Sequence, residues 1–117
     1  WQGIEGGEPV NEFVARIHAG ATEFLARHGV RRIDHELPVW DIDEPGQRLA
    51  FVAQAGTNSV LICHLLGLAP TPWEWELFGI GHASISRVSA LRLGDGWTFS
   101  LTRLSDCEHL GTDDRTL

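Results

Sequence analysis

The sequence predicts an α/β domain of three layers, in which helices cover both faces of a central sheet. Three patterns carry this prediction: an amphipathic helix, an apolar run followed by a glycine-containing turn and a second helix, and an alternating hairpin. The 117 residues are 43% hydrophobic and 21% charged, which is typical of one globular domain with a modest core.

Residues 10–28 are predicted to form the amphipathic helix. Its apolar side chains recur every three or four residues and therefore lie on one face of the helix. They are Val10, Phe13, Val14, Ile17, Ala21, Phe24 and Leu25. Pro9 suits the first turn. At the other end, Arg27 and His28 complement the helix dipole, and Gly29 supplies a left-handed cap.

The middle of the chain is predicted to form an anion-binding site. Residues 30–47 mix charges with two prolines and are expected to form a loop or an insertion. The apolar residues 49–53 predict a buried central strand, and a helix follows from about residue 58 to residue 66. A strand, a glycine-containing turn and a helix in this order leave free N–H groups that bind anions.

The last third of the chain is predicted to form a hairpin. A short helix is predicted at residues 72–78. Two strands are predicted at residues 84–93 and 97–104, joined by a Gly-Asp-Gly turn. The polar tail, residues 111–117, is expected to be frayed.

Charge and composition exclude several partners. The formal net charge is -7, which disfavours a nucleic-acid partner. No apolar run approaches the roughly 18 residues of a membrane span, so no membrane partner is expected. Cys63 and Cys107 have no metal-type spacing, so we expect free thiols, a cytoplasmic location, no metal and no cofactor.

Four segments, in order, carry a resemblance to a known family. They are GGEPVNEFVARI at 6–17, LAFVAQAGTNSVLICHLLGLAP at 49–70, HASISRV at 82–88 and SDCEHL at 105–110. Together they resemble the C-terminal half of the histidine phosphatase superfamily, the phosphoglycerate mutase-like proteins. The resemblance implies a three-layer α/β/α phosphoglycerate mutase-like fold whose sheet is incomplete in this chain.

The resemblance also implies that residues 1–117 form a single partial domain. The chain starts with Trp1 and contains no Met, so we expect a piece of a longer protein. The missing N-terminal half, or a partner chain, would complete the sheet. A homodimer formed through an exposed sheet edge is the alternative.

The site residues follow from the same resemblance. Gln54, Ala55 and Gly56 are expected to cradle a phosphate, with Gln54 at the position of the family's second catalytic His. A glutamine amide still donates hydrogen bonds but carries no charge. Glu8 is the candidate proton donor, and stabilisation of the helix N-terminus is its alternative role.

Two further residues are placed in the substrate pocket. These are Thr57, for which helix capping is the alternative, and His82. His64 is interpreted as a packed or partly exposed helix residue. The triplet Arg27-His28-Gly29 matches the letters of the family's nucleophile motif, but it lies where a helix is predicted to end.

The resemblance predicts a phosphatase or mutase acting on a small phosphorylated metabolite. The phosphorylated His of the family would lie outside this sequence, so this chain alone would be inactive. The alternative is a pseudophosphatase or a module that binds a phosphorylated ligand, because Gln54 cannot titrate.

Overall fold

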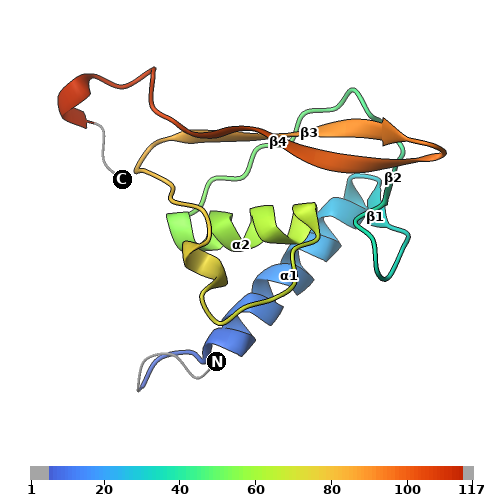
Figure 1. Ribbon diagram of the computed structural model, residues 1–117, viewed down its shortest axis with the longest axis horizontal. Helices are drawn as coiled ribbons and strands as arrows, with labels where there is room; N and C mark the ends of the chain where they lie inside the picture. Colours follow the sequence, from blue (N-terminus) through green and yellow to red (C-terminus); the bar gives the residue numbers. More distant parts are fainter. Residues whose placement is uncertain (1–5, 115–117) are drawn as a thin grey trace.

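The computed structural model describes residues 6–114, which fold into two layers (Figure 1). Helices α1 (Val10–Arg27) and α2 (Ala55–Leu66) lie together on one face of an antiparallel sheet. The sheet consists of β1 (Val30–Arg32), β2 (Trp40–Ile42), β3 (Ile85–Leu93) and β4 (Gly96–Asp106). Two 3-10 helices, η1 (Glu74–Glu76) and η2 (Thr112–Asp114), belong to the same range.

The long β3–β4 hairpin dominates the sheet, whose strand order is β1-β2-β4-β3. Val88 pairs with Leu101 and Ala90 pairs with Phe99, so these four side chains share one face. Val88 and Phe99 pack against the core, which identifies this face as the one that contacts the helices. The predicted hairpin is therefore confirmed.

Residues 30–47, for which the sequence predicted a loop or an insertion, contain the two short strands β1 and β2. These two short strands pair antiparallel, with Val30 opposite Ile42. Trp40 then pairs with Trp97 and joins β2 to β4. Apolar residues at alternate positions explain the strands, since Val30 and Trp40 are buried and Ile42 packs against the same core.

The central strand predicted at residues 49–53 is wrong. This segment has no regular secondary structure, and Val52 is fully exposed. An apolar run becomes a strand only where another strand can pair with it, and the sheet of the described residues is built from antiparallel neighbours elsewhere. The α/β class is confirmed, whereas the three-layer arrangement is not seen in residues 6–114, where both helices cover the same face.

The helix predictions hold with small changes. α1 has the predicted bounds within a residue, and Gly29 adopts a left-handed φ of 76° after its end. α2 begins at Ala55, three residues before the predicted start, and ends at Leu66, after which Gly67 has a φ of 73°. The predicted helix at 72–78 is the single turn η1. The predicted tail contains η2, and residues 115–117 lie outside the described range.

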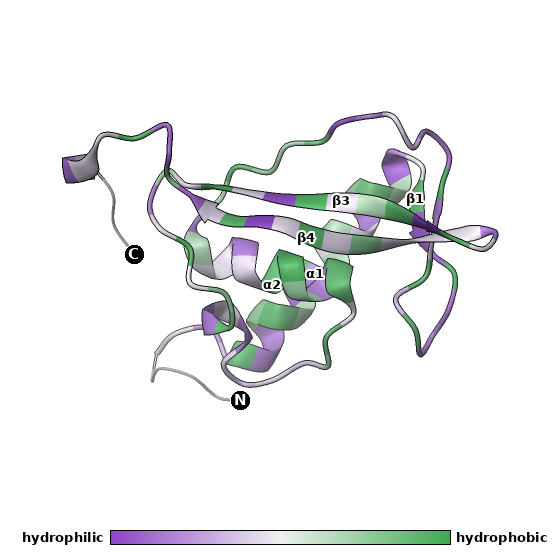
Figure 2. Ribbon diagram, turned by 45° about the horizontal axis from the view of Figure 1, so that its top comes forward, coloured by the Kyte–Doolittle hydropathy of each residue, from purple (hydrophilic) through white to green (hydrophobic). Residues whose placement is uncertain are grey.

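The core lies between the helices and the sheet, where Figure 2 shows the hydrophobic faces of α1 and α2. Its main cluster is formed by Ala21, Leu25, Val30, Trp40, Leu61 and Leu65. A second cluster joins the first turns of α1 to α2 through Val10, Val14 and Val60. None of the helices in residues 6–114 combines the length and apolar character that a membrane crossing requires.

Gly67 is predicted to be a stability determinant that alanine cannot replace. A Cβ atom at this position would lie 2.5 Å from Cβ of Pro38, and the positive φ strains any L side chain. Gly67→Ala should destabilise the protein by at least about 1–2 kcal/mol, which is the cost of a left-handed backbone alone. Urea unfolding of the purified variants measures this difference.

Gly20→Ala is the matched control, because Gly20 lies inside α1 and an added Cβ would meet no atom within 4 Å. This variant should gain about 0.5–1 kcal/mol from its higher helix propensity. Equal effects of the two substitutions would contradict the proposed role of the Gly67 backbone.

Candidate functional site

The residues of the predicted phosphate cradle lie at the start of α2. Gln54 precedes the helix as its N-cap residue and is exposed, and its side chain makes no capping hydrogen bond. Ala55 and Gly56 lie in the first turn of α2, whereas the sequence predicted them in the turn before the helix. Thr57 lies next in the same turn.

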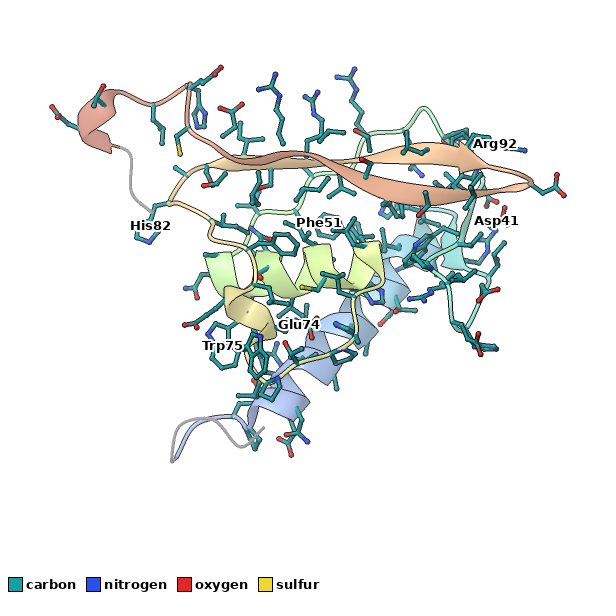
Figure 3. The ribbon with its side chains drawn as sticks, viewed as in Figure 1. Asp41, Phe51, Glu74, Trp75, His82 and Arg92 are labelled. Carbon is teal, nitrogen blue, oxygen red and sulfur yellow. The ribbon has the colours of Figure 1, made fainter. Side chains whose placement is uncertain are left out.

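The other predicted site residues lie elsewhere. Arg16 donates two hydrogen bonds to Glu8, of 3.0 and 3.1 Å, and these bonds lower the pKa of the Glu8 carboxyl. Glu8 thus forms an ion pair with Arg16 just before the start of α1. His82 is exposed in the turn before β3, where Figure 3 labels it at the edge of the molecule.

A different set of polar residues meets between the two helices. Glu74 of η1 is 0% exposed, and its Oε1 atom lies 2.9 Å from Nε2 of His18 on α1. The ring of His64 on α2 lies beside His18, with 4.7 Å between the ring centroids. A buried carboxylate is costly unless a charged or hydrogen-bonding partner compensates it, and His18 is that partner. We refer to these three residues as the His18–Glu74–His64 cluster.

Ser59 fixes Glu74 in this position. Its hydroxyl, buried in α2, donates a 2.7 Å hydrogen bond to the backbone carbonyl of Glu74. The same oxygen accepts a 3.2 Å hydrogen bond from the backbone N–H of Phe78. The start of η1 and Phe78, two residues after its end, are thereby tied to α2, and the Glu74 side chain lies between α2 and α1 (Figure 3).

His64 is the neutral member of the cluster. Burial lowers its pKa to about 4, and the nearby charges of His18 and Arg32 add to this effect. The hydroxyl of Thr22 donates its hydrogen to the His18 carbonyl at 2.8 Å, so it can only accept from Nε2 of His64, at 3.4 Å. The edge-to-face contact of His64 with the buried ring of Trp40 completes its enclosure.

An open cavity of about 480 Å³ lies against His18. Its lining consists of Asn11, Val14, Ala15 and His18 from one face of α1, with Pro70 from the loop after α2. The lining thus offers one titratable side chain and one amide on an otherwise apolar wall. Close to it, the second carboxylate oxygen of Glu74 is buried and has no hydrogen-bond partner within the described part of the chain.

A second, apolar groove of about 300 Å³ follows another face of α1. Its apolar lining comes from Ile17, Gly20, Ala21, Phe24, Phe51, Val52, Ala53 and Leu61, and its polar lining from Arg16, Thr57 and Asn58. Of the predicted site residues, Thr57 belongs to this groove. The groove carries no titratable group other than Arg16, so we take the cavity beside His18 as the candidate active site.

The described residues contain no group of three His, Cys, Asp or Glu side chains suited to a metal ion. Cys63 and Cys107 are free thiols. Burial raises the pKa of the Cys63 thiol to about 12, which makes it a poor nucleophile.

The sequence did not reveal the cluster, because His18 and Glu74 are 56 residues apart and share no spacing motif. Two weak signals were present. His18 lies at the edge of the apolar stripe of α1, four residues after Val14. Glu74 lies between two tryptophans, which is an unusual place for a carboxylate.

Comparison with known proteins shows a relative that matches most of this chain. The siroheme decarboxylase NirDL subunit of Paracoccus pantotrophus is 32% identical over 95 residues, which is 74% of this chain and 29% of that protein. The chain therefore spans less than a third of the length of this relative. No family model matches the chain, and no solved structure matches it.

This relative corrects the family predicted from the sequence. The predicted membership of the histidine phosphatase superfamily is wrong, since the relative is of a different kind and no histidine phosphatase model matches. The predicted phosphatase or mutase activity and the pseudophosphatase alternative are wrong for the same reason. The phosphorylated small-molecule partner loses its support with them.

We predict that His64 makes the stability of the protein depend on pH. The unfolded chain protonates His64 near pH 6.5, whereas the folded protein resists protonation down to about pH 4. Because the unfolded state binds the extra proton, the free energy of unfolding should fall as the pH drops from 6.5 towards 4. One proton corresponds to a slope of about 1.4 kcal/mol per pH unit.

Urea unfolding between pH 6.5 and pH 5 tests this, with His64→Gln as the variant that removes the titration. His64→Gln should show a shallower slope, by up to one proton. The control is His35→Gln, since His35 is exposed and should keep the slope of the unmodified protein. An unchanged slope in His64→Gln would show that His64 is not held neutral.

Proposed function

We propose that this chain is part of a tetrapyrrole decarboxylase that acts on siroheme or a closely related substrate. The 32% identity to a siroheme decarboxylase subunit supports the reaction class. The contact of His18 with the buried Glu74, beside an open cavity, is the observation that supports the site.

Decarboxylation requires a proton donor at the reacting carbon. The bond between that carbon and the carboxylate breaks, carbon dioxide leaves, and the electron pair stays on the carbon. A proton then takes the place of the carboxylate. Histidine is the side chain that best exchanges a proton near neutral pH.

His18 has the surroundings that this role needs. Oε1 of Glu74 lies 2.9 Å from Nε2 of His18, and this contact fixes the orientation of the ring. The other ring nitrogen, Nδ1, is then the atom that exchanges a proton with a molecule in the cavity. His64 beside it stays neutral, because burial lowers its pKa to about 4.

The walls of the cavity suit one edge of a flat ring. Val14, Ala15 and Pro70 supply apolar surface for the macrocycle, and the Asn11 amide can donate a hydrogen bond to a carboxylate. The cavity is open, and the relative is a subunit more than three times as long as the matched region. We propose that another chain or segment supplies the remaining walls.

The test is turnover of siroheme by the purified protein. Mass spectrometry follows the decrease in the mass of the tetrapyrrole when carbon dioxide is lost. We expect His18→Ala to lower the rate on the order of 10²-fold or more, because a general acid usually contributes at least this factor to the rate. Binding of siroheme, followed by its absorbance, should change far less. Glu74→Gln keeps the shape of the side chain and should give a smaller loss with a shifted pH profile.

His35→Ala is the matched control, because this histidine is exposed and lies outside the cluster. Circular dichroism shows whether each variant is folded. Unchanged turnover in a folded His18→Ala protein would overturn the role of His18. Absence of both binding and turnover in the unmodified protein would overturn the proposed function itself.

A further inference from the structure

β3 forms an open edge of the sheet. It is the last strand in the order β1-β2-β4-β3, so β4 is its only neighbour among the described strands. It is nine residues long and contains no proline and no acidic residue. A long edge strand of this kind presents a row of backbone N–H and C=O groups to a further strand.

The edge is also regular. The pairing of β3 with β4 shifts twice near Arg87, from Ile85↔Asp106 to Arg87↔Arg103 and then to Val88↔Leu101. In both steps β4 advances by one residue more than β3, so the extra residues belong to β4. Ser105 of β4 accordingly has a positive φ of 53°. β3 itself has no bulge that would turn its free edge away from a partner.

Three exposed apolar residues mark the outer face of β3. Ile85, Leu91 and Leu93 are 55%, 52% and 53% exposed. They alternate with Val88, which packs on the core, so they lie on the face turned away from the helices. Ser89 lies at the centre of the strand on the same outer face, with its hydroxyl 3.3 Å from that of Thr102.

We propose that β3 pairs antiparallel with β3 of a second copy of this chain, about a two-fold axis at Ser89. This register joins two sheets of four strands into one of eight, with all the helices on one side. It does not depend on the proposed decarboxylase function.

The spacing of the side chains selects this register. Ile85 and Leu93 lie four residues before and after Ser89, so each Ile85 packs against Leu93 of the second copy. Leu91 lies opposite Arg87, whose aliphatic stem can cover it. A shift of the axis to Val88 would pair Ile85 with Leu91 but leave Leu93 opposite Ala83, outside β3, and a shift to Ala90 would place Ile85 opposite Asp95.

Charge agrees with the same register. The charged residues of β3 are Arg87 and Arg92, and neither faces its own copy across the axis. Arg87 lies opposite Leu91, and Arg92 opposite Ser86. Pairing of a nine-residue edge buries less than the roughly 1,000 Å² of a stable interface, so we expect a dimer that dissociates on dilution.

Disulfide cross-linking tests the axis directly. Ser89→Cys places two thiols opposite each other, at the Cα separation of about 4.5–5.5 Å found in antiparallel pairs, which a disulfide can bridge. The background is Cys107→Ser, and the remaining Cys63 is buried with its thiol pKa raised to about 12. Ser89→Cys should form a dimer under mild oxidation, and the yield should rise with protein concentration.

Ser100→Cys in the same background is the matched control. Ser100 pairs with Ser89 and has the same partial burial, but it lies one strand further from the axis. Its two copies would be roughly 15 Å apart, beyond the reach of a disulfide. The expected result is a yield at least about tenfold higher for Ser89→Cys.

Sedimentation of the protein without engineered cysteines provides the second readout. The unmodified chain should show a monomer–dimer equilibrium, and Leu91→Lys should shift it towards the monomer. Equal cross-linking of the two cysteine variants would overturn the proposal, whether or not a dimer forms. A monomer at every concentration would overturn it as well, including the case in which a different protein covers the edge.

Discussion

The buried carboxylate of Glu74 is the constraint on which the helical layer depends. Its side chain is fully enclosed and meets His18 of α1, while its own backbone carbonyl is held by Ser59 of α2. One residue of η1 therefore connects both helices. Because an unpaired buried charge is far more costly than an exposed one, the histidine, the carboxylate and the serine must assemble together. The polar cluster thus fixes where α1 can lie against α2, and the apolar contacts of Val14 and Val60 fill the space beside it.

The sheet is built on a different principle, because most of its pairing is local. β3 and β4 follow each other through a two-residue connection, and β1 and β2 are separated by a short loop. These two hairpins meet where Trp40 pairs with Trp97, and the buried Trp40 ring contacts both Phe99 and His64. Trp40 therefore joins the sheet to the polar cluster. The helices cover one face only, which leaves the outer face and the β3 edge as the surfaces on which larger assemblies can form.

The same difference between local and long-range contacts decides which elements could be predicted from the sequence. α1, its glycine cap and the β3–β4 hairpin were predictable, since periodicity and turn residues encode them locally. Residues 49–53 have the composition of a strand, yet Phe51 and Val52 are exposed, because strand formation needs a neighbour that composition cannot specify. The cluster was not predictable for a related reason. His18, Ser59 and Glu74 come from three elements, and only their packing shows that His18 meets the Glu74 carboxylate while Ser59 holds the Glu74 backbone carbonyl.

The two adjacent histidines of the cluster differ in their burial and in their access to the cavity. Their ring centroids lie 4.7 Å apart, so a charge on one ring disfavours a charge on the other. Burial assigns the neutral state to His64, whose pKa is about 4. His18 contacts the Glu74 carboxylate and is also the histidine that lines the cavity. The cluster thus combines a buried, neutral ring with a second ring that a bound molecule can reach.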